Sequence, residues 1–142
     1  MPGPTFRVST MIVDASAVVP WVIQTPFSVA ARRLKPEATK APALVLLETT
    51  NALLKYVRAR QIGEDDLARA ITILTASLDE VVDDISLLPQ ATRIAATNNH
   101  KIYDCLYLAL ALERREPLAT AHRRLAALAK TLGIEAMLIE TE

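Results

Sequence analysis

The sequence predicts an α/β fold: a three-layer α/β/α domain in which a central parallel sheet is flanked by helices. Short apolar runs alternate with longer segments of helical periodicity, the order expected of a parallel sheet with crossover helices. Hydrophobic residues make up 51% of the chain, which is enough to form a folded core. The 142 residues match the size of one domain, and neither a linker nor a repeat divides them.

The first half of the predicted fold begins with a strand at residues 11–13, which stops at Asp14 and is followed by small residues. Pro20 limits the helix after Asp14, and Pro26 suits the first turn of a second helix at residues 27–34. The segments that follow are a polar loop at 35–40, a helix from 43 or 44 to 60 with apolar residues at spacings of three and four, and a helix at 64–77 that opens with three acidic residues, as the helix dipole favours.

Strands and helices continue to alternate in the second half. An Asn, Pro or Gly residue follows each predicted helix, where a helix is expected to end. The expected elements are a strand at 80–83, helices at 86–98 and 103–115, a strand at 118–120, a helix at 122–132 and a strand at 136–139. Residues 1–10 carry two prolines and no apolar segment, so we expect a flexible extension before a single domain at residues 11–142.

The composition excludes several classes of protein. Sixteen basic residues balance sixteen acidic ones, which argues against a histone-like nucleic-acid binder. The single cysteine, Cys105, allows neither an intrachain disulfide nor a cysteine zinc cluster, and no GxGxxG or Walker motif is present. The longest apolar run, residues 105–112, is far shorter than the roughly 20 residues that span a bilayer. We therefore expect a soluble, cytoplasmic protein without a membrane span.

Three carboxylates stand in apolar surroundings, whereas the other acidic residues lie in polar clusters or near the C-terminus. Asp14 ends a strand, Glu48 interrupts an apolar run, and Asp104 stands beside the apolar run that follows it. Such a carboxylate is costly unless it is paired, hydrogen-bonded or bound to a metal. Each also has a structural interpretation, because the two aspartates can cap helices and Glu48 can belong to a solvated polar stripe.

Taken together, the three carboxylates indicate a metal site. Ligands of open parallel sheets bind beyond the carboxyl ends of the strands, where Asp14 and the starts of the helices with Glu48 and Asp104 are expected. Carboxylates held close together repel one another unless a cation lies between them. Oxygen ligands suit Mg²⁺ or Mn²⁺, and such a cluster activates water for phosphodiester hydrolysis.

Four sequence motifs, in order, resemble those of PIN domains, and closely follow those of the VapC-type toxins of bacterial toxin–antitoxin pairs. They are IVDASA at residues 12–17, LETTNAL at 47–53, YDCLYLA at 103–109 and LATAHRRL at 118–125. The resemblance covers residues 11–140, which is essentially the whole predicted domain.

The resemblance implies a metal-dependent endoribonuclease that binds one or two Mg²⁺ or Mn²⁺ ions. Its target would be structured RNA such as tRNA or rRNA, cut to leave a 5′-phosphate and a 3′-hydroxyl. It also implies a homodimer, silenced by an antitoxin protein whose C-terminal segment lies across the active-site groove. By position in the motifs, the metal ligands would be Asp14, Glu48 and Asp104. Ser16 and Thr120 would hydrogen-bond the metal-bound water or the phosphate. Asn51 would orient Glu48.

The fourth motif departs from the family pattern, because His122 stands where the family has a fourth acid. Imidazole is a poor ligand for Mg²⁺ but is accepted by Mn²⁺, so any activity is expected to prefer Mn²⁺. The alternative is that His122 is a polar residue tolerated at a helix start, with no metal contact. Either way, the substitution puts a second metal site in doubt.

Basic residues beside the predicted cleft, Arg123 and Arg124, are candidates for phosphate contacts, although a charged pair on a helix is usually a solvated face. The sequence also leaves a second function open. A degenerate PIN domain that binds RNA or a protein partner without hydrolysis would fit both the His122 substitution and the zero net charge.

Overall fold

The computed structural model describes residues 10–34 and 36–141, and in this part of the chain five parallel strands form one sheet with the order β3-β2-β1-β4-β5. The strands are β1 (Thr10–Val13), β2 (Ala38–Pro42), β3 (Glu80–Val82), β4 (Leu118–Thr120) and β5 (Ala136–Leu138). Thr10 already belongs to β1, so the predicted extension at residues 1–10 is wrong at that residue. The rest of it lies outside the described residues.

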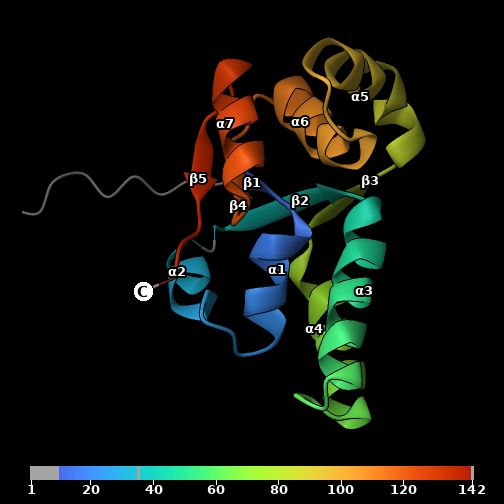
Figure 1. Cartoon of the computed structure of the whole chain (residues 1–142), viewed down its shortest axis with the longest axis vertical. Helices are drawn as coiled ribbons and strands as arrows, with labels where there is room; N and C mark the ends of the chain where they lie inside the picture. The colour runs from blue at the N-terminus through green and yellow to red at the C-terminus, as the bar shows by residue number, and fades with distance from the viewer. Residues whose placement is uncertain (1–9, 35, 142) are drawn as a thin grey trace, which may run out of the picture.

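Helices cover both faces of the sheet, as Figure 1 shows, with α1–α4 on one side and α5–α7 on the other. The helices are α1 (Ala15–Val22), α2 (Ser28–Arg33), α3 (Leu44–Arg58), α4 (Glu64–Ser77), α5 (Asp84–Asn98), α6 (Ile102–Arg114) and α7 (Arg123–Thr131). The three-layer α/β/α prediction is therefore confirmed. None of the described helices is both long and apolar enough to cross a membrane.

The predicted polar loop at residues 35–40 is wrong, because β2 begins at Ala38. Its sequence, ATKAP, has no apolar alternation and includes Pro42 and Lys40, so no local pattern indicates a strand. The segment becomes a strand because it pairs with β1 on one side and β3 on the other. Tertiary pairing decides its structure.

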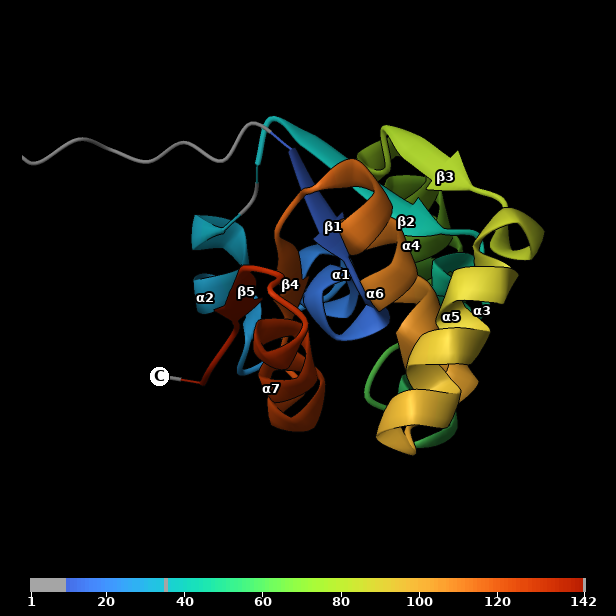
Figure 2. The same ribbon diagram turned by 90° about the horizontal axis from the view of Figure 1, so that it is seen from above.

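The core lies where α6 packs against the centre of the sheet (Figure 2). Residues 105–111 of α6 are all buried, since the helix contacts β1, β2 and β4 on one side and α5 on the other. This explains why the helix is apolar nearly all round. The exceptions are its two ends, with the partly exposed Asp104 in the first turn and Glu113 and Arg114 in the last.

The sheet has a topological switch point between β1 and β4. The chain proceeds from β1 through β2 to β3 in one direction, and β4 then pairs with the opposite side of β1. Val13 is in register with Ala119, so the residues that follow them, Asp14 and Thr120, come side by side. In open parallel sheets, ligands bind at such a point.

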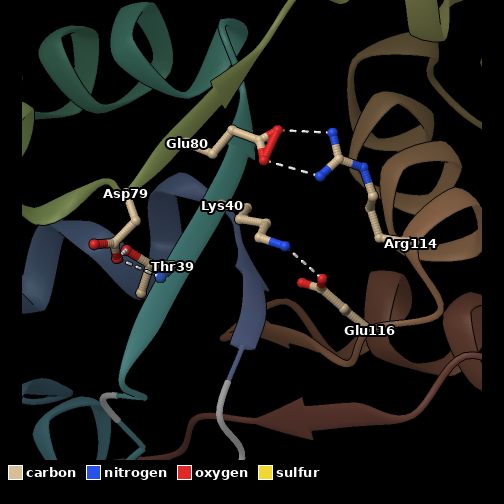
Figure 3. A network of polar contacts seen from close by, with 6 residues as sticks. All are labelled: Thr39, Lys40, Asp79, Glu80, Arg114 and Glu116. Atoms are coloured by element: carbon tan, nitrogen blue, oxygen red, sulfur yellow. Dashed lines mark hydrogen bonds and ion pairs between the residues drawn. The ribbon is translucent and has the colours of Figure 1, made fainter.

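At the other end of α6, an ion-paired cluster joins the helix to β2 and β3 (Figure 3). We call Lys40, Glu80, Arg114 and Glu116 the amino-edge network. The guanidinium of Arg114 donates to both carboxylate oxygens of Glu80, at 2.9 and 2.7 Å, and the Lys40 Nζ lies 2.7 Å from the Glu116 Oε1. Arg114 lowers the pKa of the Glu80 carboxyl.

Candidate active site

Asp14 is buried at the junction of β1 and α1, with 3% of its surface exposed. Its Oδ1 accepts hydrogen bonds from the Ser16 Oγ at 2.6 Å and from the Ala17 backbone N at 3.1 Å, and its Oδ2 accepts one from the Thr120 Oγ1 at 2.5 Å. The bond from Ala17 is an N-cap, so the structural interpretation of Asp14 holds as well. Burial raises the pKa of the Asp14 carboxyl, and the bonds from Ser16 and Thr120 partly offset this effect.

Two hydroxyl groups, one at the start of α1 and one at the end of β4, connect these elements and the residues after β4. The Ser16 Oγ accepts a hydrogen bond from the Ala121 N at 2.8 Å, and the Thr120 Oγ1 accepts one from the His122 N at 3.1 Å. Each hydroxyl also donates to Asp14, so their single protons are directed to that carboxylate rather than into the groove. Ser16 and Thr120 therefore hold Asp14 in place in this arrangement.

Glu48 lies on α3, and the hydroxyl of Tyr107 on α6 donates to its Oε1 at 2.5 Å. Burial is the main cause that raises the pKa of the Glu48 carboxyl, and the negative charges of Asp104 and Asp14 raise it further. Burial and the contact with Glu48 raise the pKa of the Tyr107 hydroxyl far above its ordinary value, so it stays protonated as a donor.

Tyr107 was not predicted as a site residue. It lies in the apolar run after Asp104, and its 1% exposure is that of a core residue. Asn51, which was expected to orient Glu48, makes no side-chain hydrogen bond to it within the described part of the chain. The tyrosine is one turn beyond Asp104 on α6, so an aromatic residue with a polar tip at that spacing is the signal that could have indicated it.

Asp104 is in the first turn of α6, and its Oδ2 lies 2.8 Å from the Nε2 of His100. The His100 side chain is 7% exposed and that of Asp104 is 32% exposed. Asn99, with left-handed backbone at the end of α5, turns the chain so that His100 precedes α6 by two residues. No partner for His100 could be predicted, because a polar turn does not indicate which side chain its residues will contact.

These side chains form the carboxylate site, which we define as Asp14, Glu48 and Asp104. Glu48 and Asp104 line one cavity, and the negative charges of Asp14 and Asp104 both raise the pKa of Glu48, as expected of side chains that lie in one region. As placed, no three His, Cys, Asp or Glu side chains among the described residues form a ready metal-binding group. The donor chemistry nevertheless fits a hard cation, since the Glu48 Oε2 and the Asp104 Oδ1 accept no hydrogen bond from any described residue.

Two cavities meet at this site, and both are lined by Glu48 and His122. The first, which we call the α1–α3 cavity, has a volume of about 460 Å³ and runs between those helices; Ser16 and Asn51 also line it. The second, the α6–α7 cavity, has a volume of about 550 Å³ and is lined by Asp104 and Arg124, among others. Together they form a groove that passes Glu48 and Asp104, while the buried Asp14 lines neither cavity.

His122 is exposed at the start of α7, where its side chain does not cap the helix. It is near enough to lower the pKa values of Asp14 and Glu48. Arg123 and Arg124 are both exposed, but only Arg124 lines a cavity of the groove. The structure thus brings His122 and Arg124 to the site, and leaves Arg123 outside the two cavities.

The fold and the site place this protein in a class: α/β/α domains with carboxylates at the switch point of a parallel sheet. The particular family follows from the sequence: the PIN domain model matches residues 11–131, and the chain belongs to this family. The predicted resemblance to PIN domains is thereby confirmed. No curated protein matches the sequence.

Several solved structures share the fold. PAE2754 from Pyrobaculum aerophilum is 26% identical, with a TM-score of 0.67 and coverage of 91% of this chain and 90% of that chain. VapC20 of Mycobacterium tuberculosis, a toxin that cleaves the sarcin–ricin loop, is 19% identical, with a TM-score of 0.66 and coverage of 82% and 93%. A toxin–antitoxin complex from Klebsiella pneumoniae is 14% identical, with a TM-score of 0.64 and coverage of 82% and 90%.

Proposed function

We propose that this protein is a metal-dependent endoribonuclease and the toxin of a toxin–antitoxin pair. The observation that carries the proposal is the carboxylate site. Its three acids come from distant parts of the chain, and no Lys or Arg within the described residues forms an ion pair with them. Both aspartates raise the pKa of the Glu48 carboxyl, and a cation bound between the acids would relieve this repulsion.

Asp14, Glu48 and Asp104 would hold Mg²⁺ or Mn²⁺ through carboxylate oxygens. When bound, such a cation neutralises phosphate charge and lowers the pKa of a coordinated water. Ser16 and Thr120 fix the orientation of Asp14, and His100 fixes that of Asp104. Glu48 completes the ligand set or accepts a proton from the attacking water through its Oε2, while Tyr107 holds its Oε1.

We further propose that the activity prefers Mn²⁺ and that His122 is the cause, since His122 and Glu48 both line the two cavities of the groove. Replacing it, as His122→Asp, is expected to raise cleavage supported by Mg²⁺. Rates measured at saturating Mg²⁺ and Mn²⁺ for both proteins test this. Equal rates for the wild type in the two metals, or no gain in the variant, would show that His122 is not a ligand.

The proposed substrate is structured RNA of the tRNA or rRNA class, cut to a 5′-phosphate and a 3′-hydroxyl. VapC20, which shares the fold, cleaves the sarcin–ricin loop. The toxin–antitoxin complex with the same fold supports an antitoxin as the protein partner. A homodimer in the cytoplasm is proposed from family membership alone.

The test is cleavage of total RNA by purified protein, freed of any partner, in EDTA, Mg²⁺ and Mn²⁺. Asp104→Asn serves as the matched variant, because it removes one charge at a partly exposed position and keeps the size of the side chain. We expect cleavage that requires the metal and is lost in the variant. Folding of both proteins is verified by circular dichroism.

Two results would overturn the proposal. Cleavage by Asp104→Asn at the wild-type rate would remove Asp104 from the site. RNA binding without cleavage in any divalent metal, by folded protein, would favour the binding-only PIN domain instead, and His122 would then be the first residue to examine.

A further inference from the structure

The α1–α3 cavity is lined by side chains that metal binding and hydrolysis at the carboxylate site do not require. Beyond Glu48, its walls include two aromatic side chains that are each partly exposed, Phe27 before α2 and Tyr56 on α3. Val19 and Ala52 line it as well. Metal binding and hydrolysis use none of these apolar groups, so this part of the groove is suited to a different portion of the ligand.

Two polar side chains of α3 complete the cavity. Asn51 and Lys55 are exposed and lie one and two turns beyond Glu48 on the same helix face. The Lys55 ammonium makes no ion pair with any described carboxylate. Seven residues separate Lys55 from Glu48, which is about 10 Å along a helix, so the cation and the carboxylate site can contact different phosphates of one strand.

This combination matches a nucleotide. Bases of single-stranded nucleic acid stack on aromatic rings, an exposed amide can hydrogen-bond the edge of a base, and an ammonium group pairs with the phosphate. The cavity volume of about 460 Å³ lies within the usual range for small-ligand sites, roughly 300–1,000 Å³. A base in a duplex is stacked between its neighbours and cannot enter such a side cavity.

We propose that the α1–α3 cavity binds one unpaired nucleobase adjacent to the scissile phosphate, with Phe27 and Tyr56 as the aromatic walls and Lys55 on the next phosphate. The inference rests on the proposed nuclease function and adds to it a requirement: the substrate must present an unpaired nucleotide beside the bond that is cut. The α6–α7 cavity, whose exposed wall includes Lys101 and Arg124, then receives the strand on the other side.

The experiment measures binding in EDTA, so that no cleavage takes place. Three labelled probes are compared by fluorescence anisotropy: a mixed-sequence single-stranded RNA 12-mer, the same strand in a duplex, and an abasic ribose-phosphate strand of the same length. The abasic strand keeps the backbone charge and lacks the bases. We expect the single strand to bind roughly tenfold more tightly than the abasic strand, as the loss of one base–aromatic stack would predict.

Variants assign that difference to the cavity. The single variants Tyr56→Leu and Phe27→Leu are each expected to lose most of the preference for the base-bearing strand. Tyr56→Phe, which keeps the aromatic ring, is expected to retain it. Leu88→Ala is the matched control, because Leu88 on α5 is an exposed apolar residue that lines neither cavity of the groove. Lys55→Gln should weaken binding of the base-bearing and abasic strands equally. Thermal unfolding verifies that each variant is folded.

Equal affinity of wild-type protein for the base-bearing and abasic strands would overturn the inference. So would a preference that Tyr56→Leu and Leu88→Ala reduce alike. These results are independent of cleavage: a protein without nuclease activity can still show the preference, and an active nuclease without the preference would refute the base site alone.

Discussion

The two ends of α6 carry acidic clusters of opposite character. At the amino edge of the sheet, Glu80 and Glu116 are each ion-paired, to Arg114 and Lys40. At the carboxyl edge, the acids of the carboxylate site meet hydroxyl groups, a backbone amide and His100, but no described Lys or Arg. One helix thus joins a cluster in which each acid is paired with a Lys or Arg to one in which no acid is paired with a described Lys or Arg.

The pKa shifts differ in the same way. Arg114 lowers the pKa of Glu80, so that carboxyl is more easily ionised in the fold than in a free chain. Burial raises the pKa values of Asp14 and Glu48, so the fold opposes their ionisation. Keeping these carboxyls ionised costs the folded protein stability, and carboxyls with perturbed pKa values are typical of functional sites. The amino-edge network stabilises the fold, whereas the carboxylate site is proposed to bind and react.

The largest expected contrast is in catalysis. Asp14→Asn removes a proposed ligand and should lower RNA cleavage by more than the roughly 10- to 100-fold that loss of a supporting group costs. Glu80→Gln removes a charge of the same sign at the other cluster and should leave the rate unchanged. Single-turnover cleavage rates of both variants, each verified as folded, measure the contrast. Similar losses in the two variants would mean that the clusters do not differ in function.

A second prediction concerns the hydrogen bond from Tyr107 to Glu48. Tyr107→Phe should lower cleavage by roughly 10- to 100-fold, as expected for a group that positions a ligand. The bond lowers the pKa of Glu48, so its removal raises that pKa further, and the acidic limb of the rate profile should move to higher pH. The measurement is cleavage rate against pH. Tyr103→Phe on the same helix is the control, and an unshifted profile in Tyr107→Phe would exclude the positioning role.

The smallest effect is expected at the amino-edge network. Because Arg114 depresses the pKa of Glu80 in the fold, the pair stabilises the protein above the ordinary carboxyl pKa, and this contribution is lost as the pH falls through the lowered value. The pair is partly exposed and screened by solvent, so Arg114→Met should cost at most about 1 kcal/mol at pH 7. Urea unfolding at pH 7 and at pH 3 measures the difference. A difference that persists unchanged at low pH would show that packing, not charge, is the cause.

Much of the fold followed from local patterns, and the failures share a physical cause. The helix expected at 64–77 matches α4, because three acidic residues open it and its apolar periodicity is regular. The strand β2 was missed, since its Lys40 and Pro42 mask any alternation and its pairing comes from distant segments. Local patterns indicate elements well where the chain itself supplies the reason for them.

The candidate site shows the same division. Asp14, Glu48 and Asp104 could be selected because each carboxylate contrasts with apolar neighbours in the sequence. Of the groups that hold two of them, Tyr107 had only its polar tip one turn beyond Asp104 as a signal, and His100 had none, because a side-chain contact itself leaves no mark in composition. The pairing of Phe27 with Tyr56 around one cavity was hidden for the same reason.

The most direct test of the central claim is Mn²⁺ binding, measured by the electron paramagnetic resonance signal of the free ion during titration of the protein. The account predicts saturable binding by the wild type and by Glu80→Gln, and loss of that binding in Asp14→Asn and in Asp104→Asn. Wild-type protein that binds no Mn²⁺, or binding that all three variants retain equally, would contradict the assignment of the carboxylate site as a metal centre.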